Sequence, residues 1–199
     1  MRNIAGIILA GGRSSRMGVE KALMDFAGRP VIAHVIERFA PQVDLVAINA
    51  NGDRARFAAF DAPIIADAFT DHVGPLAGIA AGLSWARDAG FGLVAFTPCD
   101  APFTPRDLVA RLLRARGEAP IVMAQSARGL EPLFALWSID ALAPLEVALR
   151  NGASAVHSVS RALGAVIAPI ESGKNVPDWA LNMNNPEDVK TALAMIASR

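Results

Sequence analysis

A segment rich in glycine and basic residues follows the first apolar run of the chain, between Leu9 and Lys21. Its glycines let the backbone approach a phosphate and turn N–H groups toward the oxygens. Arg13, Arg16 and Lys21 add positive charge, since arginine binds phosphate oxygens in pairs and lysine acts as a point charge. The spacing matches neither the Walker A motif nor the Rossmann fingerprint. We therefore predict a phosphate-binding loop of another kind, in preference to a solvated turn.

Three other apolar runs end in a polar residue, namely Asn49, Asp67 and Asp100. Ligands of open α/β sheets bind beyond the carboxyl ends of the strands, where these residues would meet the glycine loop. Asp100 lies two residues from each of two prolines that stiffen its loop, and one carboxylate can hold Mg²⁺, which also takes phosphates and water. A lone aspartate is often only a turn cap. The coincidence of four strand ends therefore carries the prediction of a nucleotide site.

The elements that must position these residues alternate between short apolar runs and helical patterns, which predicts an α/β fold with a mainly parallel sheet. We expect strands at residues 4–9, 45–48, 63–66, 93–97, 121–124, 133–137 and 166–170. We expect helices at residues 30–39, 76–89, 138–149 and 154–163, one starting at 104–107, and a last one starting at 185. Gly78 and Gly82 share a helix face and would let that helix approach the sheet. Thr104 is the expected N-cap of its helix.

Length and composition limit the class of protein. The 199 residues suit a single domain. Nineteen basic and nineteen acidic residues cancel, so no global field favours nucleic acid or an acidic membrane. The lone Cys99 excludes an internal disulfide. The first apolar run is too short to span a membrane, and we expect a soluble cytoplasmic protein.

The glycine loop carries a family resemblance. Leu9-Ala10-Gly11-Gly12, followed by Arg16-Met17-Gly18 and Lys21, resembles the signature loop of nucleotidyltransferases with the nucleotide-diphospho-sugar transferase fold. The double glycine is most similar to the molybdenum cofactor guanylyltransferases, because related cytidylyltransferases typically carry Leu-Ala-Ala-Gly. Val19-Glu20 departs from the commoner Gly-Asp. The resemblance implies a three-layer αβα, Rossmann-like fold, and it is densest in the first half of the chain. It also implies a nucleotide half over about residues 1–105 and an acceptor half over about residues 106–199 of the single domain.

Four later segments also resemble motifs of this family. They are Asp67 with Gly74-Pro75-Leu76-Ala77-Gly78, then Pro98-Cys99-Asp100-Ala101-Pro102, then the stretch from Glu131 to Leu136, and finally Asn182-Met183-Asn184-Asn185-Pro186-Glu187-Asp188. In the last segment, Asn185 stands where the family has threonine. The stretch that starts at Glu131 corresponds to one near the acceptor site of the family, although its alternation alone indicates only a strand.

The resemblance implies a role for each matching residue. The implied nucleotide-binding residues are Leu9, Ala10, Gly11, Gly12, Lys21, Asn49, Asp67, Gly78 and Asp100. The implied catalytic residues are Arg16, Lys21 and Asp100, with Asp100 as the magnesium ligand. Asn182 and Asn184 have amide groups that suit a pterin, and we expect them to bind the acceptor. A carboxylate at Asp67 suits the paired N1–H and amine donors of guanine, and contact with the ribose stays an alternative.

The implied reaction transfers GMP from GTP to Mo-molybdopterin with Mg²⁺ and releases pyrophosphate. The implied partners are proteins that insert the molybdenum cofactor, together with apo-molybdoenzymes. One alternative is a cytidylyltransferase that acts on molybdopterin or on a sugar or polyol phosphate. The other is a protein that binds GTP or the molybdenum cofactor without catalysis. Gly11-Gly12 and the segment from Gly74 to Gly78 favour the guanylyltransferase over the cytidylyltransferase.

Overall fold

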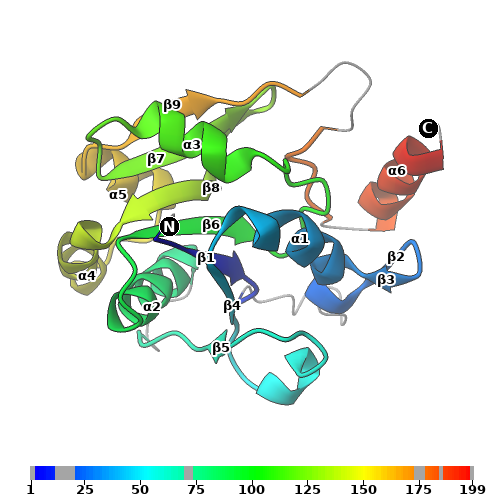
Figure 1. Ribbon diagram of the computed structural model, residues 1–199, viewed down its shortest axis with the longest axis horizontal. Coiled ribbons are helices and arrows are strands. Elements are labelled where there is room, and N and C mark those ends of the chain that lie inside the picture. The colour runs from blue at the N-terminus through cyan, green and yellow to red at the C-terminus, as the bar shows by residue number, and fades with distance from the viewer. Residues whose placement is uncertain (1–2, 12–20, 70–73, 173–177, 184–185, 198–199) are drawn as a thin grey trace.

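The computed structural model describes residues 3–11, 21–69, 74–172, 178–183 and 186–197, and within them a seven-stranded sheet has the order β5-β4-β1-β6-β8-β7-β9 (Figure 1). Its strands are β1 (Ile4–Leu9), β4 (Leu45–Asn49), β5 (Ile64–Ile65), β6 (Leu93–Pro98), β7 (Ile121–Ser126), β8 (Gly129–Ser138) and β9 (Val166–Pro169). The helices are α1 (Val31–Phe39), α2 (Pro75–Asp88), α3 (Leu108–Arg116), α4 (Leu142–Arg150), α5 (Val156–Ala162) and α6 (Pro186–Ala197). Short 3-10 turns are η1 (Lys21–Leu23), η2 (Ala40–Gln42), η3 (Arg54–Phe57) and η4 (Ile139–Ala141).

The sheet is mainly parallel. β1 lies between β4 and β6 and pairs in parallel with both, while β5 and β9 add parallel pairs to β4 and β7. Only β8 runs against its neighbours β6 and β7 among the described strands of this sheet. All six residues of β1 are buried, as expected for a central strand covered on both faces. The predicted α/β fold with a mainly parallel sheet is therefore confirmed.

Helices cover both faces of the sheet, with a separate hydrophobic cluster on each. Successive side chains of β1 alternate between the clusters, because strand residues point to opposite faces in turn. Ile8 packs with α1 and α3 on one face, and Ile7 packs with α2, α4 and α5 on the other. The three-layer αβα architecture expected from the family resemblance is thus confirmed.

The two glycines of α2 let that helix lie close to the sheet. A Cβ atom on Gly82 would lie 2.9 Å from side-chain carbons of both Ile7 and Phe96, which belong to β1 and β6. Gly78 faces the same layer one turn earlier, against Leu9 and Asn49. The predicted role of these glycines in close packing is confirmed, and it places the start of α2 beside the carboxyl end of β1.

The expectation that Thr104 caps a helix is wrong. Helix α3 begins at Leu108, and Asp107 holds its N-cap position. Thr104 is buried, and its hydroxyl donates to the carbonyl oxygen of Ala101 at 2.8 Å. The threonine therefore closes the loop after β6. It does not cap the helix, because the helix starts four residues later, beyond the N–H groups from which an N-cap oxygen accepts.

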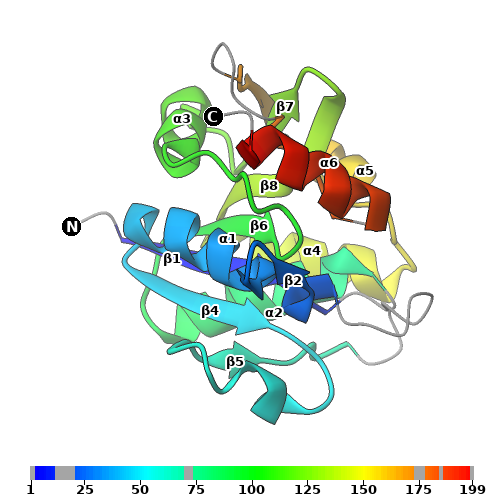
Figure 2. The same ribbon diagram turned by 90° about the vertical axis from the view of Figure 1, so that its right-hand side faces the viewer.

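A small hairpin and the C-terminal segment form a third cluster. Strands β2 (Asp25–Phe26) and β3 (Arg29–Pro30) pair in an antiparallel hairpin. Phe26 packs in one cluster with Phe103, Leu181 and Met183. Figures 1 and 2 show α6 beside this hairpin, at the edge toward which β1 and β6 point. The cluster therefore holds the C-terminal segment at the carboxyl ends of the central strands.

Among the described residues, no helix has the length and apolarity to cross a bilayer.

Candidate active site

Backbone hydrogen bonds continue past the ends of the parallel strands and align their last residues. The N–H of Ala10 donates to the carbonyl oxygen of Asn49 at 2.8 Å, and the N–H of Cys99 donates to that of Leu9 at 3.1 Å. The N–H of Ala50 donates to the carbonyl oxygen of Ile65 at 2.9 Å. These bonds bring the start of the glycine loop, Asn49 and the Asp100 loop to one edge of the sheet, as the sequence predicts.

Most of the predicted site residues lie at this edge, and some cannot be placed. Leu9, Ala10 and Gly11 begin the loop, and Lys21 follows it in η1. Gly12, Arg13, Arg16 and Asn184 lie outside the described residues, so their predicted roles are not tested by the structure.

Lys21 and Asp100 form a partly shielded ion pair. Nζ of Lys21 lies 3.7 Å from Oδ2 of Asp100, and the side chains are 30% and 15% exposed. Burial raises the pKa of the Asp100 carboxyl above its ordinary value, the Lys21 ammonium opposes this shift, and the Asp188 carboxylate reinforces it. A cationic ligand beside Asp100 would favour the ionised carboxylate. A cation bound at the loop after β6 would therefore stabilise the negative charge of Asp100, which burial disfavours.

The donor set around Asp100 fits Mg²⁺. Mg²⁺ takes one or two carboxylates from a protein and completes its octahedron with phosphate oxygens and water. Asp100 supplies one carboxylate, and Asp188 of α6 lies near enough to affect its titration. The Lys21 ammonium forms an ion pair with the Asp100 carboxylate. From this position it can also bind a phosphate that lies beside Asp100. This arrangement suits a metal ion shared with a nucleotide phosphate.

The C-terminal segment lies directly against the Asp100 loop. The N–H of Met183 donates to the carbonyl oxygen of Asp100 at 2.9 Å. Trp179 anchors the same segment, since its indole N–H donates to the carbonyl oxygen of Ile170 and its ring meets that of Phe134 edge-on. Asn182, half-buried, therefore lies beside the candidate metal ligand, on the side where the acceptor is expected.

A network of three polar side chains lies at the ends of β4 and β5. Nδ2 of Asn49 donates to Oδ1 of Asp67 at 2.8 Å, and Nδ2 of Asn51 donates to Oδ2 of Asp67 at 2.7 Å. The backbone N–H of Asp67 donates in turn to Oδ1 of Asn51 at 2.9 Å. The sequence predicts Asn49 and Asp67 as site residues and misses Asn51. Asn51 could be inferred from its distance of two residues from Asn49, since residues two apart in an extended segment point to the same side.

Two glycines lie against this network. A Cβ atom on Gly11 would lie 3.3 Å from Oδ1 of Asn49 and 3.5 Å from Nδ2 of Asn51. A Cβ atom on Gly78 would overlap Oδ1 of Asn49 and lie 3.1 Å from its Cγ. The first glycine of the loop and the first turn of α2 thus enclose the Asn49 side chain. Gly78 requires the small residue, whereas a larger residue at Gly11 would only tighten the contact with Asn49.

A second polar group lies at the turn between β7 and β8, at the same edge of the sheet. The Ser126 hydroxyl donates to Oε1 of Glu131 at 2.9 Å, and Nε of Arg128 lies 3.7 Å from Oδ2 of Asp178. Burial raises the pKa of the Glu131 carboxyl, the Ser126 hydrogen bond opposes this, and Asp178 adds to it. Glu131 is thus held beside the chain segment that leads to Asn182.

The raised pKa of Glu131 predicts a pH-dependent effect of Glu131→Gln. A carboxyl with a raised pKa in the folded state stabilises the fold at low pH and loses that contribution as pH rises through the folded pKa. The variant should therefore gain stability over the wild type between pH 4 and pH 7, by about 1–2 °C in melting temperature. Thermal melts at both pH values measure this. Glu118→Gln, at an exposed position, controls for the lost charge, and a difference independent of pH would contradict the expectation.

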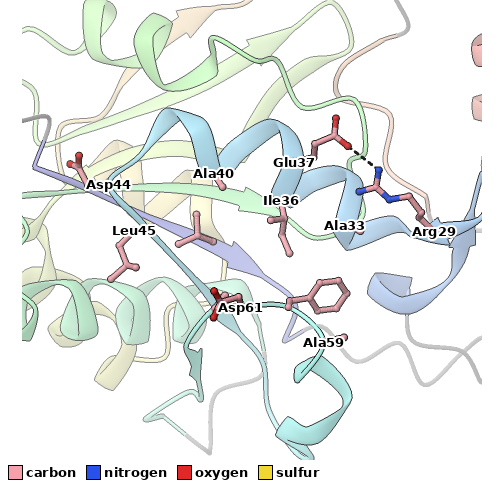
Figure 3. A pocket seen from close by; sticks show the side chains of 12 residues that line it. Arg29, Ala33, Ile36, Glu37, Ala40, Asp44, Leu45, Ala59 and Asp61 are labelled. Carbon is pink, nitrogen blue, oxygen red and sulfur yellow. Dashed lines mark hydrogen bonds and ion pairs between the residues drawn. The ribbon is translucent and has the colours of Figure 1, made fainter.

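A groove of about 540 Å³ lies elsewhere, beside α1 and the segment after η3 (Figure 3). Its lining includes Ile36, Glu37 and Phe60, and Nη1 of Arg29 donates to Oε2 of Glu37 at 3.0 Å. Among the described residues, none of those predicted to bind nucleotide, metal or acceptor lines this groove. The candidate active site is therefore the strand-end edge and not the groove.

Comparison with known proteins identifies the family. The family profile described as the MobA-like NTP transferase domain matches residues 6–166. This chain belongs to that family. It is 44% identical over 196 residues to a molybdenum cofactor guanylyltransferase of Rhodopseudomonas palustris (strain BisB5). This alignment covers 94% of this chain and 90% of the relative. It is 39% identical over 192 residues to a protein of the same name from Cereibacter sphaeroides, with 96% of each chain covered.

A solved structure gives the same result for the fold. The crystal structure of molybdopterin-guanine dinucleotide biosynthesis protein A from Archaeoglobus fulgidus aligns with a TM-score of 0.78 at 22% sequence identity. The alignment covers 98% of this chain and 100% of that one. The nucleotidyltransferase family and fold expected from the glycine loop are confirmed, and the roles of the individual site residues stay predictions.

Proposed function

We propose that this MobA-like NTP transferase is a molybdenum cofactor guanylyltransferase, which transfers GMP from GTP to Mo-molybdopterin and releases pyrophosphate. The observation that carries the proposal is the shielded Lys21–Asp100 ion pair, held at the same sheet edge as the glycine loop and the Asn49–Asp67 network. The names of the relatives that are 38–44% identical support the choice of substrates.

The nucleotide half would bind GTP through its phosphates and its nucleoside. Backbone N–H groups of the loop that starts at Leu9, together with Arg16, would hold the β- and γ-phosphates. Asp67 would accept hydrogen bonds from the nucleoside, either from the paired N1–H and amine donors of guanine or from the ribose hydroxyls. Asn49 would orient that carboxylate, since it already donates to Oδ1. We assign this half to about residues 1–105, where the strand ends around β1 converge.

In the reaction, an oxygen of the terminal phosphate of molybdopterin attacks the α-phosphorus of GTP. The bond from the α-phosphorus to the oxygen that bridges to the β-phosphate breaks, and pyrophosphate leaves with that oxygen. The acceptor is already an anion, so positioning and charge neutralisation carry the catalysis and no strong general base is required. Lys21 would offset charge at the α-phosphate. Mg²⁺ held by Asp100 would supply further neutralisation.

The acceptor half completes the proposed site. Asn182 lies next to Met183, whose N–H donates to the Asp100 carbonyl oxygen. This backbone contact supports the proposal that the Asn182 amide binds the pterin of the acceptor. We propose the same acceptor role for Asn184. The protein partners that follow from this function are those that insert the molybdenum cofactor and the apo-molybdoenzymes that receive it, in the cytoplasm.

A panel of nucleotides tests the proposal. Pyrophosphate release is measured with molybdopterin and Mg²⁺ in the presence of GTP, CTP, ATP or UTP. We expect kcat/KM for GTP to exceed that for each other nucleotide by about 100-fold or more, since a site built for polar groups discriminates strongly against bases that lack them. Equal or preferential use of CTP would favour the cytidylyltransferase. GTP binding without pyrophosphate release would favour the non-catalytic alternative.

A further inference from the structure

We infer that Asn51 is a positioning residue for the nucleoside: it fixes the orientation of the Asp67 carboxylate and so sets how well the site selects among nucleotides. The inference rests on the proposed function in one respect only, namely that a guanine nucleotide binds at this edge of the sheet. Asn51 would contact no reacting atom and would act through Asp67.

The contact between Asn51 and Asp67 has two points. Nδ2 of Asn51 donates to Oδ2 of Asp67 at 2.7 Å, and Oδ1 of Asn51 accepts from the backbone N–H of Asp67 at 2.9 Å. One amide therefore fixes both the main chain and the carboxylate of Asp67. Asn49 donates to the other oxygen, Oδ1, at 2.8 Å. With one amide donor on each oxygen, the plane of the carboxylate is defined by two bonds.

The carboxylate keeps capacity to accept two further bonds. A carboxylate offers about four lone-pair sites, and each of the two amides uses one. The remaining sites, one on each oxygen, match a pair of adjacent donors on a nucleoside, whether these are N–H groups of the base or hydroxyls of the ribose. A rotated carboxylate would meet only one of two such donors, so its orientation determines the selectivity.

The turn that carries Asn51 is itself braced. The Arg56 guanidinium donates from Nη2 to the carbonyl oxygen of Asn51 and from Nε to that of Asp53 at 2.8 Å. The same guanidinium lies 5.3 Å from the centre of the Phe57 ring, which is buried in the core. Gly52 makes the turn possible with φ of +80°. Asn51 is exposed, but its backbone is linked to the core through Arg56. This link restricts the position from which the Asn51 side chain donates to Asp67.

The braced network lies where the nucleoside must follow the phosphates. A Cβ atom on Gly11, at the start of the phosphate loop, would lie 3.5 Å from Nδ2 of Asn51 and 3.9 Å from Oδ2 of Asp67. The Asn51–Asp67 contact is therefore adjacent to the loop and not a remote surface bond.

Asn51→Ala tests the inference by equilibrium binding, measured for GTP with Mg²⁺ and for three analogues. The analogues are ITP, which lacks the exocyclic amine, and 2′-deoxy- and 3′-deoxy-GTP, which each lack one ribose hydroxyl. We expect the Kd for GTP to rise about 10-fold, the loss expected for a misaligned pair of polar contacts. The preference for GTP over the analogue that lacks the bonded group should fall by a similar factor. Loss of preference over ITP would place Asp67 on the base, and loss over a deoxy analogue would place it on the ribose.

A double-mutant cycle with Asp67→Ala separates action through Asp67 from an independent effect. If Asn51 acts through Asp67, adding Asn51→Ala to Asp67→Ala should change the Kd for GTP by no more than about 2-fold. Asn51→Asp should bind GTP more weakly than Asn51→Ala, because it sets a second carboxylate against Asp67. Additive losses in the cycle would overturn the inference.

Asn151→Ala is the matched control, since Asn151 is an exposed asparagine at the end of α4. It should leave the Kd values unchanged. If Asn51→Ala weakens all nucleotides equally and lowers the melting temperature, Asn51 is only a structural residue and the inference fails. The inference stands on binding alone, so a wild-type protein that binds GTP but releases no pyrophosphate would contradict the proposed reaction and leave this result intact.

Discussion

Asp100→Ala is expected to lower kcat/KM for pyrophosphate release by about 1000-fold or more, because it removes the proposed magnesium ligand and the partner of Lys21. The loop should keep its shape, since Met183 bonds to the carbonyl oxygen of Asp100 and not to its side chain. The Lys21 side chain is 30% exposed and can remain solvated without its partner. The variant should therefore fold like the wild type and fail in turnover.

Activity assays and thermal melts together check this expectation. Asp107→Ala is the matched control, because Asp107 is an exposed aspartate near the same loop and pairs with Arg111 on the surface. It should retain activity. Asp100→Asn keeps the shape of the side chain and should be nearly as inactive as Asp100→Ala. Near-wild-type turnover in either Asp100 variant would rule out the metal assignment.

Gly78→Ala is expected to weaken GTP use by about 100-fold in kcat/KM, although alanine is the better helix former by about 1 kcal/mol. The added Cβ would overlap Oδ1 of Asn49 and lie 3.1 Å from Cδ2 of Leu9. Asn49 would have to leave its position, and its bond to Asp67 would be lost. The defect should appear mainly as a raised KM for GTP.

Gly82→Ala provides the contrast, with the same substitution one turn further along α2. Its Cβ would press on Ile7 and Phe96 in the core and not on the polar network. Overpacking of this kind costs about 1–3 kcal/mol of stability, so its melting temperature should fall while its KM for GTP stays near the wild-type value. A wild-type KM in Gly78→Ala, or equal KM effects in the two variants, would contradict the assigned role of Asn49.

The sequence predicts the fold and the general location of the site because both depend on local patterns. Uninterrupted apolar runs such as Ile4–Leu9 indicate strands buried on both faces, and the polar residues that follow them must meet at one edge of a parallel sheet. Asn49, Asp67 and Asp100 follow this rule. The glycine loop adds a family resemblance that the match over residues 6–166 confirms.

What the sequence does not predict depends on contacts between distant segments. The link from Met183 to Asp100 spans most of the second half of the chain, and no periodicity encodes it. The β2–β3 hairpin is too short to produce an alternating pattern. Thr104 has the residue type of an N-cap, but the helix starts only at Leu108, and the Thr104 hydroxyl instead bonds to the carbonyl oxygen of Ala101. The sequence does not single out Asn51, because asparagine is common in turns that have no role in binding.

The transfer of the α-phosphate is the most direct test of the proposed function. The purified protein is mixed with Mg²⁺, molybdopterin and GTP labelled at the α-phosphorus, and the labelled products are separated. We predict that the label moves to a molybdopterin guanine dinucleotide in equal amount to the pyrophosphate released, and that Asp100→Ala forms none. Label that stays in GTP, or that appears only as free GMP, would contradict guanylyl transfer at this site.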